Sequence, residues 1–408
     1  MKETIKKLVA KIPFAKRSYR AIRRRIDASC GKAVGDSNPN KSKLLILKQG
    51  APECFEKMPL RVHWHITKNC NFRCSYCFNA GKEYANVYCT LEQIETAITH
   101  LVSSNRSSYH IILTGGEPTV HPHIAEIVNL IHVNMGNRLE CLSMTTNGSF
   151  DEKFMEAIIV ASNQHIIKLN VSIHLEYMGI ERIVDLVKRM SNHVVMILHI
   201  MFHPELQEKA PMFADTLCRL RKNYAFYIEI NMLREPPLFD KIDRRYTREQ
   251  LRWPKEMTDK FRECASGGVG WTRNVPKTTG WEYMAELIVD DKRETHEKLS
   301  PSALEALTGN YFQGMICCAG VNVIHIGVDG KVKGMECRND NTDCNIFEEN
   351  PFEKEDWIHG VKCTSPKCTC GINHCIPKFK STMDVEKFIA EKRREQKRLM
   401  DKYKKKNE

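Results

Sequence analysis

The sequence predicts an α/β protein, a partial (β/α)6 TIM-like barrel with a small cysteine-rich module near its C-terminal end. Three observations lead to this prediction. Six runs with strand periodicity alternate with helical runs between residues 60 and 232, which favours parallel strands joined by right-handed crossovers. Six such units are fewer than the eight that close a full barrel. The pattern then changes, and eight of the 17 cysteines follow residue 316.

The elements are expected in close succession. Strands are predicted at residues 60–66, 109–113, 141–145, 167–173, 194–201 and 225–232, and helices at residues 91–101, 123–132, 154–161, 180–190 and 212–220. A later hairpin is expected around a turn at Asp329-Gly330. We therefore expect five segments, namely a basic amphipathic N-terminal segment and linker (1–57), a barrel core (58–245), a helical and irregular connection (246–310), the cysteine-rich module (311–380) and a charged C-terminal helix (381–408).

The charge is concentrated at the two ends of the chain. Of 62 Lys and Arg and 50 Asp and Glu, residues 1–26 hold ten basic and one acidic side chain, and residues 386–408 hold ten and five. The middle is therefore close to neutral, and we expect no nucleic-acid substrate, because a nucleic-acid enzyme more often carries positive charge beside its chemistry.

No run of about 18 apolar residues is present, which argues against a membrane-spanning helix. Residues 1–26 place apolar side chains at helical spacing among arginines and lysines. This pattern suits peripheral contact with anionic lipid, while a nucleic-acid arm, a transit peptide and a solvated helix face stay open as alternatives. With no apolar secretory region, we expect a cytoplasmic protein, either free or bound at the inner face of the membrane.

Three clustered cysteines follow the first predicted strand. Cys70, Cys74 and Cys77 form a C-x-x-x-C-x-x-C run. Three thiolates at this spacing can bind three irons of a cubane cluster and leave the fourth iron open for chemistry. A structural zinc site completed by His63 or His65 is the alternative. Disulfides are the poorer interpretation in the absence of export.

This run resembles the hallmark of the radical S-adenosylmethionine (radical SAM) superfamily, including an aromatic residue before its third cysteine. After the second predicted strand, residues 114–118 (TGGEP) resemble the family's Gly-Gly-Glu motif. Residues 145–148 (TTNG) follow the third strand, and two polar residues lie on the fourth. All these positions are at the carboxyl ends of strands, where parallel sheets bind ligands. The resemblance implies that S-adenosylmethionine contacts Tyr76, Gly115, Gly116, Glu117, Asn147, Ser172 and His174.

The cysteine-rich module resembles the SPASM or twitch extension of radical SAM enzymes, which holds auxiliary iron–sulfur clusters. The resemblance implies at least one auxiliary cluster, although the cysteine spacing fits the usual pattern only in part. The preferred ligands are Cys318, Cys337, Cys368 and Cys370, followed by Cys363 and Cys375, with Cys317, Cys344 and His374 as bystanders. A zinc ribbon is the alternative, because zinc and iron share thiolate ligands.

The resemblance implies an enzyme that reductively cleaves S-adenosylmethionine at a 4Fe–4S cluster. The resulting 5′-deoxyadenosyl radical would abstract a hydrogen atom from a peptide, protein or carbohydrate substrate. Such an enzyme needs a one-electron reductant such as flavodoxin or ferredoxin. A non-catalytic electron-transfer protein, or a zinc-stabilised scaffold, is the alternative from a different functional class.

Overall fold

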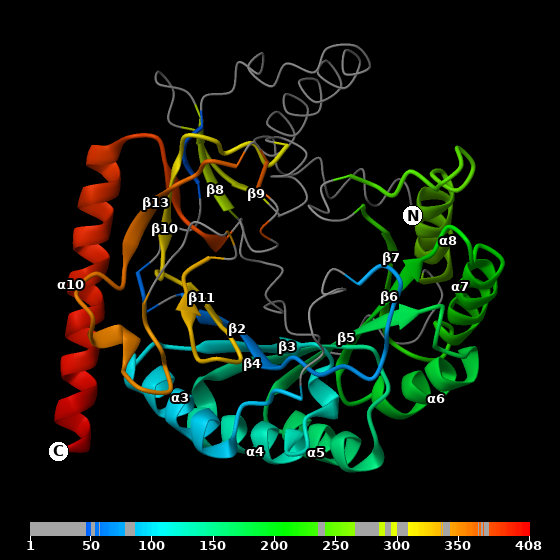
Figure 1. The fold of residues 1–408 in the computed structure, drawn as a ribbon, viewed down its shortest axis with the longest axis horizontal. Helices are drawn as coiled ribbons and strands as arrows, with labels where there is room; N and C mark the ends of the chain where they lie inside the picture. The colour runs from blue at the N-terminus through cyan, green and yellow to red at the C-terminus, as the bar shows by residue number, and fades with distance from the viewer. Residues whose placement is uncertain are drawn as a thin grey trace, which may run out of the picture.

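The computed structural model is shown in Figure 1. It describes residues 46–49, 54–56, 58–77, 86–235, 241–265, 285–289, 295–299, 309–335, 337, 343–365, 367–368, 370 and 375–408. The basic segment 1–26, for which membrane contact is expected, lies outside the described residues.

The main sheet has eight strands in the order β12-β11-β2-β3-β4-β5-β6-β7. The six strands expected between residues 60 and 232 are its parallel core, which confirms the predicted fold class. Their bounds are β2 Leu60–Thr67, β3 Tyr109–Gly115, β4 Leu139–Thr146, β5 Ile166–His174, β6 Val195–Phe202 and β7 Tyr227–Met232.

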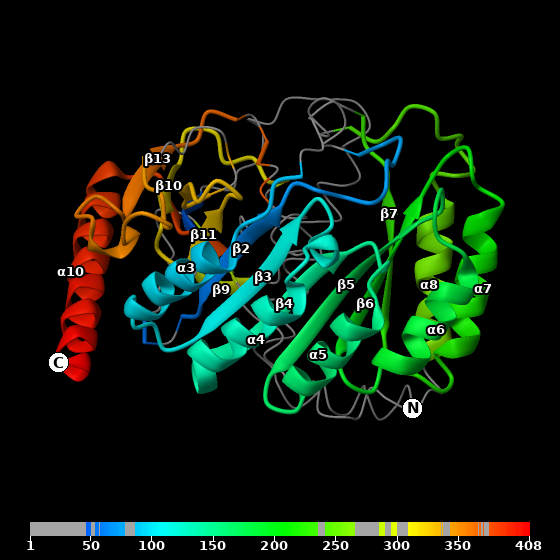
Figure 2. The same cartoon turned by 60° about the horizontal axis from the view of Figure 1, so that its bottom comes forward.

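Five helices cover the outer side of this sheet, as Figures 1 and 2 show. They are α3 Leu91–Ser103, α4 Ile124–Met135, α5 Glu152–Ser162, α6 Ile180–Met190 and α7 Lys209–Leu220. The local sequence sets where they begin. Thr90 and Gln93 form a reciprocal capping box at α3, and Asp151 accepts the Phe154 amide at α5.

Successive side chains along each strand point to opposite faces of the sheet. On β2, Leu60, Val62 and Trp64 are fully buried, while the intervening Arg61 and His63 are partly exposed. The buried set joins the main hydrophobic core with residues of the helices. The intervening residues line the concave side, so this side is polar. Strand register determines which side chains lie on it.

A second, antiparallel sheet has the order β13-β10-β14-β1-β8-β9. Its strands are β1 Ile46–Gln49, β8 Ala285–Val289, β9 Thr295–Leu299, β10 Ile316–Ala319, β13 His359–Lys362 and β14 Lys378–Phe379. Strands β8 and β9 follow helix α8 Trp253–Ala265, in a stretch where the sequence suggested helix and irregular chain. Short strands of this kind are stabilised by pairing with strands that are distant in the chain, so their local sequence pattern is weak.

The expected hairpin forms, but it extends the barrel. Strand β11 Val323–Ile326 pairs with β12 Val332–Lys333 and lies parallel to β2. The register runs from Val323 opposite Arg61 to Ile326 opposite Trp64. The cysteine-rich segment and the barrel are therefore joined through one continuous sheet.

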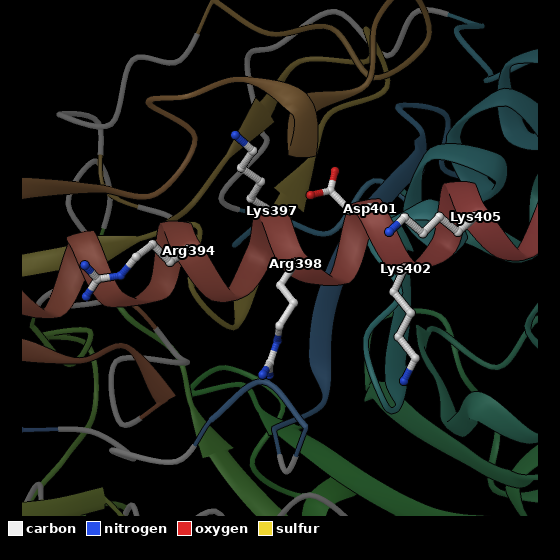
Figure 3. A pocket seen from close by; sticks show the side chains of 6 residues that line it. All are labelled: Arg394, Lys397, Arg398, Asp401, Lys402 and Lys405. Atoms are coloured by element: carbon white, nitrogen blue, oxygen red, sulfur yellow. The ribbon is translucent and has the colours of Figure 1, made fainter.

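The C-terminal segment is a 26-residue helix, α10 Thr382–Asn407, which begins at Ser381. It packs beside β10, β13, β14 and α3. Its outer face carries a basic cavity of about 550 Å³, shown in Figure 3 and lined by Arg394, Lys397, Arg398, Asp401, Lys402 and Lys405. In the described part of the chain, every helix is too short or too polar to cross a membrane.

Candidate functional site

The cysteine triplet lies in the loop that follows β2. The Cys77 amide donates to the Cys74 carbonyl over 3.1 Å, and the Phe72 amide lies 3.4 Å from Cys70 Sγ. Burial, together with Glu176, Cys77 and Cys70, raises the pKa of the Cys74 thiol to about 12. Burial also raises the pKa of Cys70, which the Phe72 amide opposes. Cys70 and Cys77 thus lie near enough to Cys74 to influence its ionisation.

The donor set has the right chemistry for an iron–sulfur cluster. Three thiolates on one loop suit iron, and an amide pointing at a sulfur is a recognised way to stabilise a ligating thiolate. Within the described ranges, no three His, Cys, Asp or Glu side chains already stand in a metal-binding arrangement.

The zinc alternative depends on a histidine of β2 reaching this loop. The His63 ring instead packs against His325 of β11, with ring centroids 4.8 Å apart. Burial lowers the pKa of His63 to about 2. His63 therefore belongs to the concave face of the sheet, away from the cysteine loop.

Two glycines bring the end of β3 against the start of the cysteine loop. Gly115 has a φ of +148°, and a Cβ on it would lie 2.2 Å from the Thr67 carbonyl oxygen. A Cβ on Gly116 would lie 2.2 Å from the Asn69 carbonyl oxygen. The amides of Gly116 and Glu117 donate to these same two carbonyls. Side chains are excluded here because two backbones touch.

Glu117 is buried, with 1% of its surface exposed. Its Oε1 accepts hydrogen bonds from the Thr119 amide, the Thr119 hydroxyl and the Thr146 hydroxyl, at 3.1, 2.6 and 2.7 Å. Its Oε2 accepts from the Asn147 amide at 2.5 Å. Burial raises the pKa of Glu117, against the effect of these bonds. The carboxylate thus ties the end of β3 to the end of β4, and its contact with a methionine ammonium group stays a prediction.

Asn147 links the end of β4 to the cysteine loop. Its side-chain amide donates to Asn71 Oδ1 over 2.8 Å, and its own Oδ1 accepts from the Ser149 amide. Asn71 in turn donates to the Ser149 hydroxyl. The residue expected to contact the cofactor is therefore placed beside the loop that carries the thiols.

His174, at the end of β5, lies against the cysteine loop. Its Nδ1 is 2.7 Å from the Tyr76 hydroxyl and 3.3 Å from Cys74 Sγ. Burial lowers the pKa of His174 to about 4, and burial together with Cys74 raises the pKa of Tyr76. Ser172 lies two residues earlier on the same face of β5, opposite His199 of β6. Of the two expected ribose contacts, the structure brings His174 to the cysteines and leaves Ser172 deeper in the barrel.

Two further residues contact the cysteine loop at this edge of the sheet and were not predicted from the sequence. Glu176 accepts the Ser75 amide at 3.1 Å, and His203 Nε2 lies 3.2 Å from the Ser75 hydroxyl. His203 immediately follows β6, so the rule that singled out the ends of the earlier strands would have found it. Glu176 lies in the turn after β5, where the strand pattern has already ended.

The cysteines of the second set gather on one side of β10. Cys317 shares a small buried cluster with Cys370 and Cys375, and Cys363 and Cys368 pack against it. Burial raises the pKa of Cys317 to about 12, opposed by Lys378 and reinforced by Cys363, Cys368 and Cys337. The structure thus brings together Cys317, Cys337, Cys363, Cys368, Cys370 and Cys375.

Cys318 faces the other way. It is 1% exposed within the main hydrophobic core, and its amide donates to the Pro377 carbonyl. Adjacent residues of a strand point to opposite faces, so Cys317 and Cys318 cannot both face the cysteine cluster. The ordering expected from the sequence, with Cys318 preferred and Cys317 a bystander, differs from this placement. Cys344 interacts with Glu349 and Lys354, and His374 lies outside the described residues.

The fold and the thiol loop together define a class of protein, a parallel partial barrel that presents cysteines at the carboxyl edge of its strands. Residues 64–174 match the model of the radical SAM superfamily. The matched segment contains the cysteine triplet, the Gly-Gly-Glu motif and His174, so these residues lie in a radical SAM domain. Proteins of this superfamily bind a 4Fe–4S cluster and S-adenosylmethionine.

The similar proteins differ in how much of this chain, and of their own length, the similarity covers. The probable GTP 3′,8-cyclase of Thermococcus kodakarensis is 36% identical over 110 residues, 27% of this chain and 33% of that protein. The probable GTP 3′,8-cyclase of Saccharolobus solfataricus is 25% identical over 68% of this chain and 82% of that protein. The chain thus spans about a third of the length of the Thermococcus relative.

Two solved structures are similar at lower identity. One is anSMEcpe with bound AdoMet and a peptide, at 15% identity, with 85% of this chain and 99% of that chain covered and a TM-score of 0.48. The other is Streptococcus suis SuiB, at 17% identity, with 74% of this chain and 66% of that chain covered and a TM-score of 0.44.

Proposed function

We propose that this chain reductively cleaves S-adenosylmethionine at a 4Fe–4S cluster held by Cys70, Cys74 and Cys77 and abstracts a hydrogen atom from a substrate. The observation that carries the proposal is the convergence of three strand ends, those of β3, β4 and β5, on the loop with these cysteines. When bound, the cluster and S-adenosylmethionine supply the electron transfer and the 5′-deoxyadenosyl radical that removes the hydrogen atom.

The chain's own residues would position and shield these groups. Gly115 and Gly116 support the proposal because they allow the end of β3 to approach the loop backbone. Glu117 and Asn147 hold the neighbouring strand end in place. Tyr76 and His174 lie beside Cys74, where their rings would exclude water from one side of the cluster. Ser172 stays a proposed ribose contact.

A second proposal concerns the C-terminal cysteines. The clustering around Cys317 supports an auxiliary iron–sulfur site with ligands from Cys317, Cys337, Cys363, Cys368, Cys370 and Cys375. We place Cys318 outside this ligand set because its side of β10 belongs to the main core. A structural zinc site in the same cluster is the alternative outcome, separable by the metal that the purified protein retains.

The substrate is proposed only by class. A peptide, a protein or a carbohydrate was expected from the sequence, and the relatives named GTP 3′,8-cyclases add a nucleotide to these candidates. A one-electron reductant such as flavodoxin or ferredoxin is the proposed partner. A cytoplasmic location is likewise a proposal, as is membrane contact through residues 1–26.

Anaerobic reconstitution followed by reduction with dithionite tests the reaction. With S-adenosylmethionine present, the wild-type protein is expected to release 5′-deoxyadenosine, measured by chromatography. Cys74→Ala should abolish the product and lower the bound iron by about four atoms per chain, because a cubane missing one ligand is poorly held. Cys218→Ala is the matched control, a buried cysteine of helix α7 outside the site.

Undiminished 5′-deoxyadenosine from Cys74→Ala would contradict the site assignment. A wild-type protein that binds iron but forms no product would favour the alternative of a non-catalytic iron–sulfur protein.

A further inference from the structure

The concave face of the barrel gathers basic side chains from separate strands. Strand pairing places Arg61 of β2 opposite His110 of β3. Two residues further along the same strands, His63 lies opposite Ile112. On the same face, Lys168 of β5 lies opposite Ser143 of β4, which itself lies opposite Ile112. Burial lowers the pKa of His110, and Arg61, Lys168 and His63 lower it further. The four basic residues therefore lie close together, although they come from three strands.

This face holds more positive than negative charge. Arg61 and Lys168 are the strongly basic side chains of this face, and burial, which leaves Lys168 only 9% exposed, lowers the pKa of Lys168. On the described strands β2 to β7 and β11, the concave positions hold one carboxylate, Glu229 of β7. Glu229 lies 3.3 Å from His199, its neighbour on β6. Burying positive charge is costly, and an oxyanion bound among these basic side chains would lower that cost.

His63 adds a polar atom that points to the same conclusion. Its Nε2 is buried and meets no hydrogen-bond partner among the described residues. Buried polar groups are almost always hydrogen-bonded, so such an atom calls for a ligand or an ordered water. Arg61 is held in place by its Nη1, which lies 3.0 Å from Cys375 Sγ, and His110 by its contact with Ser143 at 2.7 Å.

We propose that the concave face between β2, β3 and β5 binds an oxyanion of the substrate, a phosphate or a carboxylate, through Arg61, Lys168 and His63. This inference rests on the proposed function, because it assigns the face to the substrate of the same barrel. Arginine and lysine both suit oxyanions, arginine through paired N–H groups and lysine as a compact charge. A substrate bound in this way would be oriented with its anionic end against these three side chains.

Calorimetric titration of the full-length, cluster-reconstituted protein tests this site. The two probes are inorganic pyrophosphate, which represents phosphate esters, and succinate, which represents carboxylates. We expect saturable binding of at least one probe, and the stronger of the two identifies the source of the oxyanion. Lys168→Met should weaken that binding about ten-fold or more, and Lys168→Arg should retain most of it. Lys188→Met, which removes an exposed lysine of helix α6, should leave it unchanged.

The inference fails if neither probe binds, or if Lys168→Met binds as tightly as the wild type. His63→Phe supplies a second test should Lys168→Met not fold, because it keeps an aromatic ring and removes the nitrogen. Unchanged binding in His63→Phe would also overturn the assignment. Release of 5′-deoxyadenosine without added anion, measured on the same preparations, tests the proposed function separately, so either proposal can fail alone.

Discussion

At the scale of single residues, Glu117 has more contacts than its motif alone suggested. The sequence places it at a strand end beside the expected cofactor. In the structure, its carboxylate accepts four hydrogen bonds, which come from Thr119, Thr146 and Asn147. These donors belong to the ends of two strands. Glu117 therefore has a role in holding the fold together, whether or not it also contacts S-adenosylmethionine.

Glu117→Gln tests this role. A glutamine amide replaces one accepting oxygen with a donor and leaves at least one of the four donors without an acceptor. The free energy of unfolding should fall by about 1–3 kcal/mol, the usual cost of an unsatisfied buried polar group, as measured by urea titration. Glu156→Gln on the exposed side of α5 should change it by less than about 0.5 kcal/mol. Unaltered stability in Glu117→Gln, with weaker S-adenosylmethionine binding alone, would show that the residue acts only on the cofactor.

At the scale of elements, strand β10 decides which cysteine faces the second cluster. Its four residues pair with β13 on one side and β14 on the other. This pairing turns Cys317 toward Cys363 and Cys368 and turns Cys318 into the main core. A shift of one residue in register would exchange the two side chains, so no argument from cysteine spacing alone could separate them.

Comparing Cys317→Ala with Cys318→Ala tests the proposed auxiliary site. Cys317→Ala should lower reconstituted iron and sulfide by about four atoms each per chain, if the cluster is a cubane. Cys318→Ala should retain both, and should cost roughly 1 kcal/mol of unfolding free energy for the small cavity it leaves. Iron analysis and denaturant titration on the same samples distinguish these results. Loss of iron from Cys318→Ala alone would restore the ligand order expected from the sequence.

At the scale of the whole molecule, helix α10 joins the two ends of the described chain. Lys392, 1% exposed, lies 3.0 Å from Glu395, and Glu395 Oε2 accepts the Phe55 amide at 3.2 Å. The Arg106 guanidinium lies 3.3 Å from the centroid of the Phe55 ring, and the Lys392 ammonium group lies 5.6 Å from it. The last helix thus holds the segment that leads into β2, and hence the start of the barrel.

Breaking the pair between Lys392 and Glu395 tests that link. Glu395→Gln leaves the buried Lys392 ammonium group with the exposed Glu391 as its one acidic partner among the described residues, so the unfolding free energy should fall by about 3 kcal/mol in a denaturant titration. Adding Lys392→Met should restore much of the loss, because the stranded charge is removed. Arg398→Gln breaks the exposed pair with Glu56 and should cost less than about 1 kcal/mol. Equal effects of Glu395→Gln and Arg398→Gln would mean that burial adds nothing to the pair.

Local sequence patterns were sufficient to specify the order of the barrel elements and the position of the proposed site. Strand and helix periodicities are local, so residues 60–232 carry them without reference to the rest of the chain. The carboxyl ends of parallel strands meet at one edge of a sheet. For this reason the sequence alone could place the segments of Cys70, Glu117, Asn147 and His174 together.

How distant segments meet was decided by tertiary packing. It set β11 beside β2, turned Cys317 rather than Cys318 toward the second cysteine cluster, and gave Glu117 its donors from Thr146 and Asn147. It also brought Arg61, His110 and Lys168 onto one face. Each of these results depends on how separate segments pack against one another, and a shift of one residue in strand register turns every side chain of the strand to the other face. The chain's local pattern specifies which segments form strands, while packing between segments specifies what those strands present.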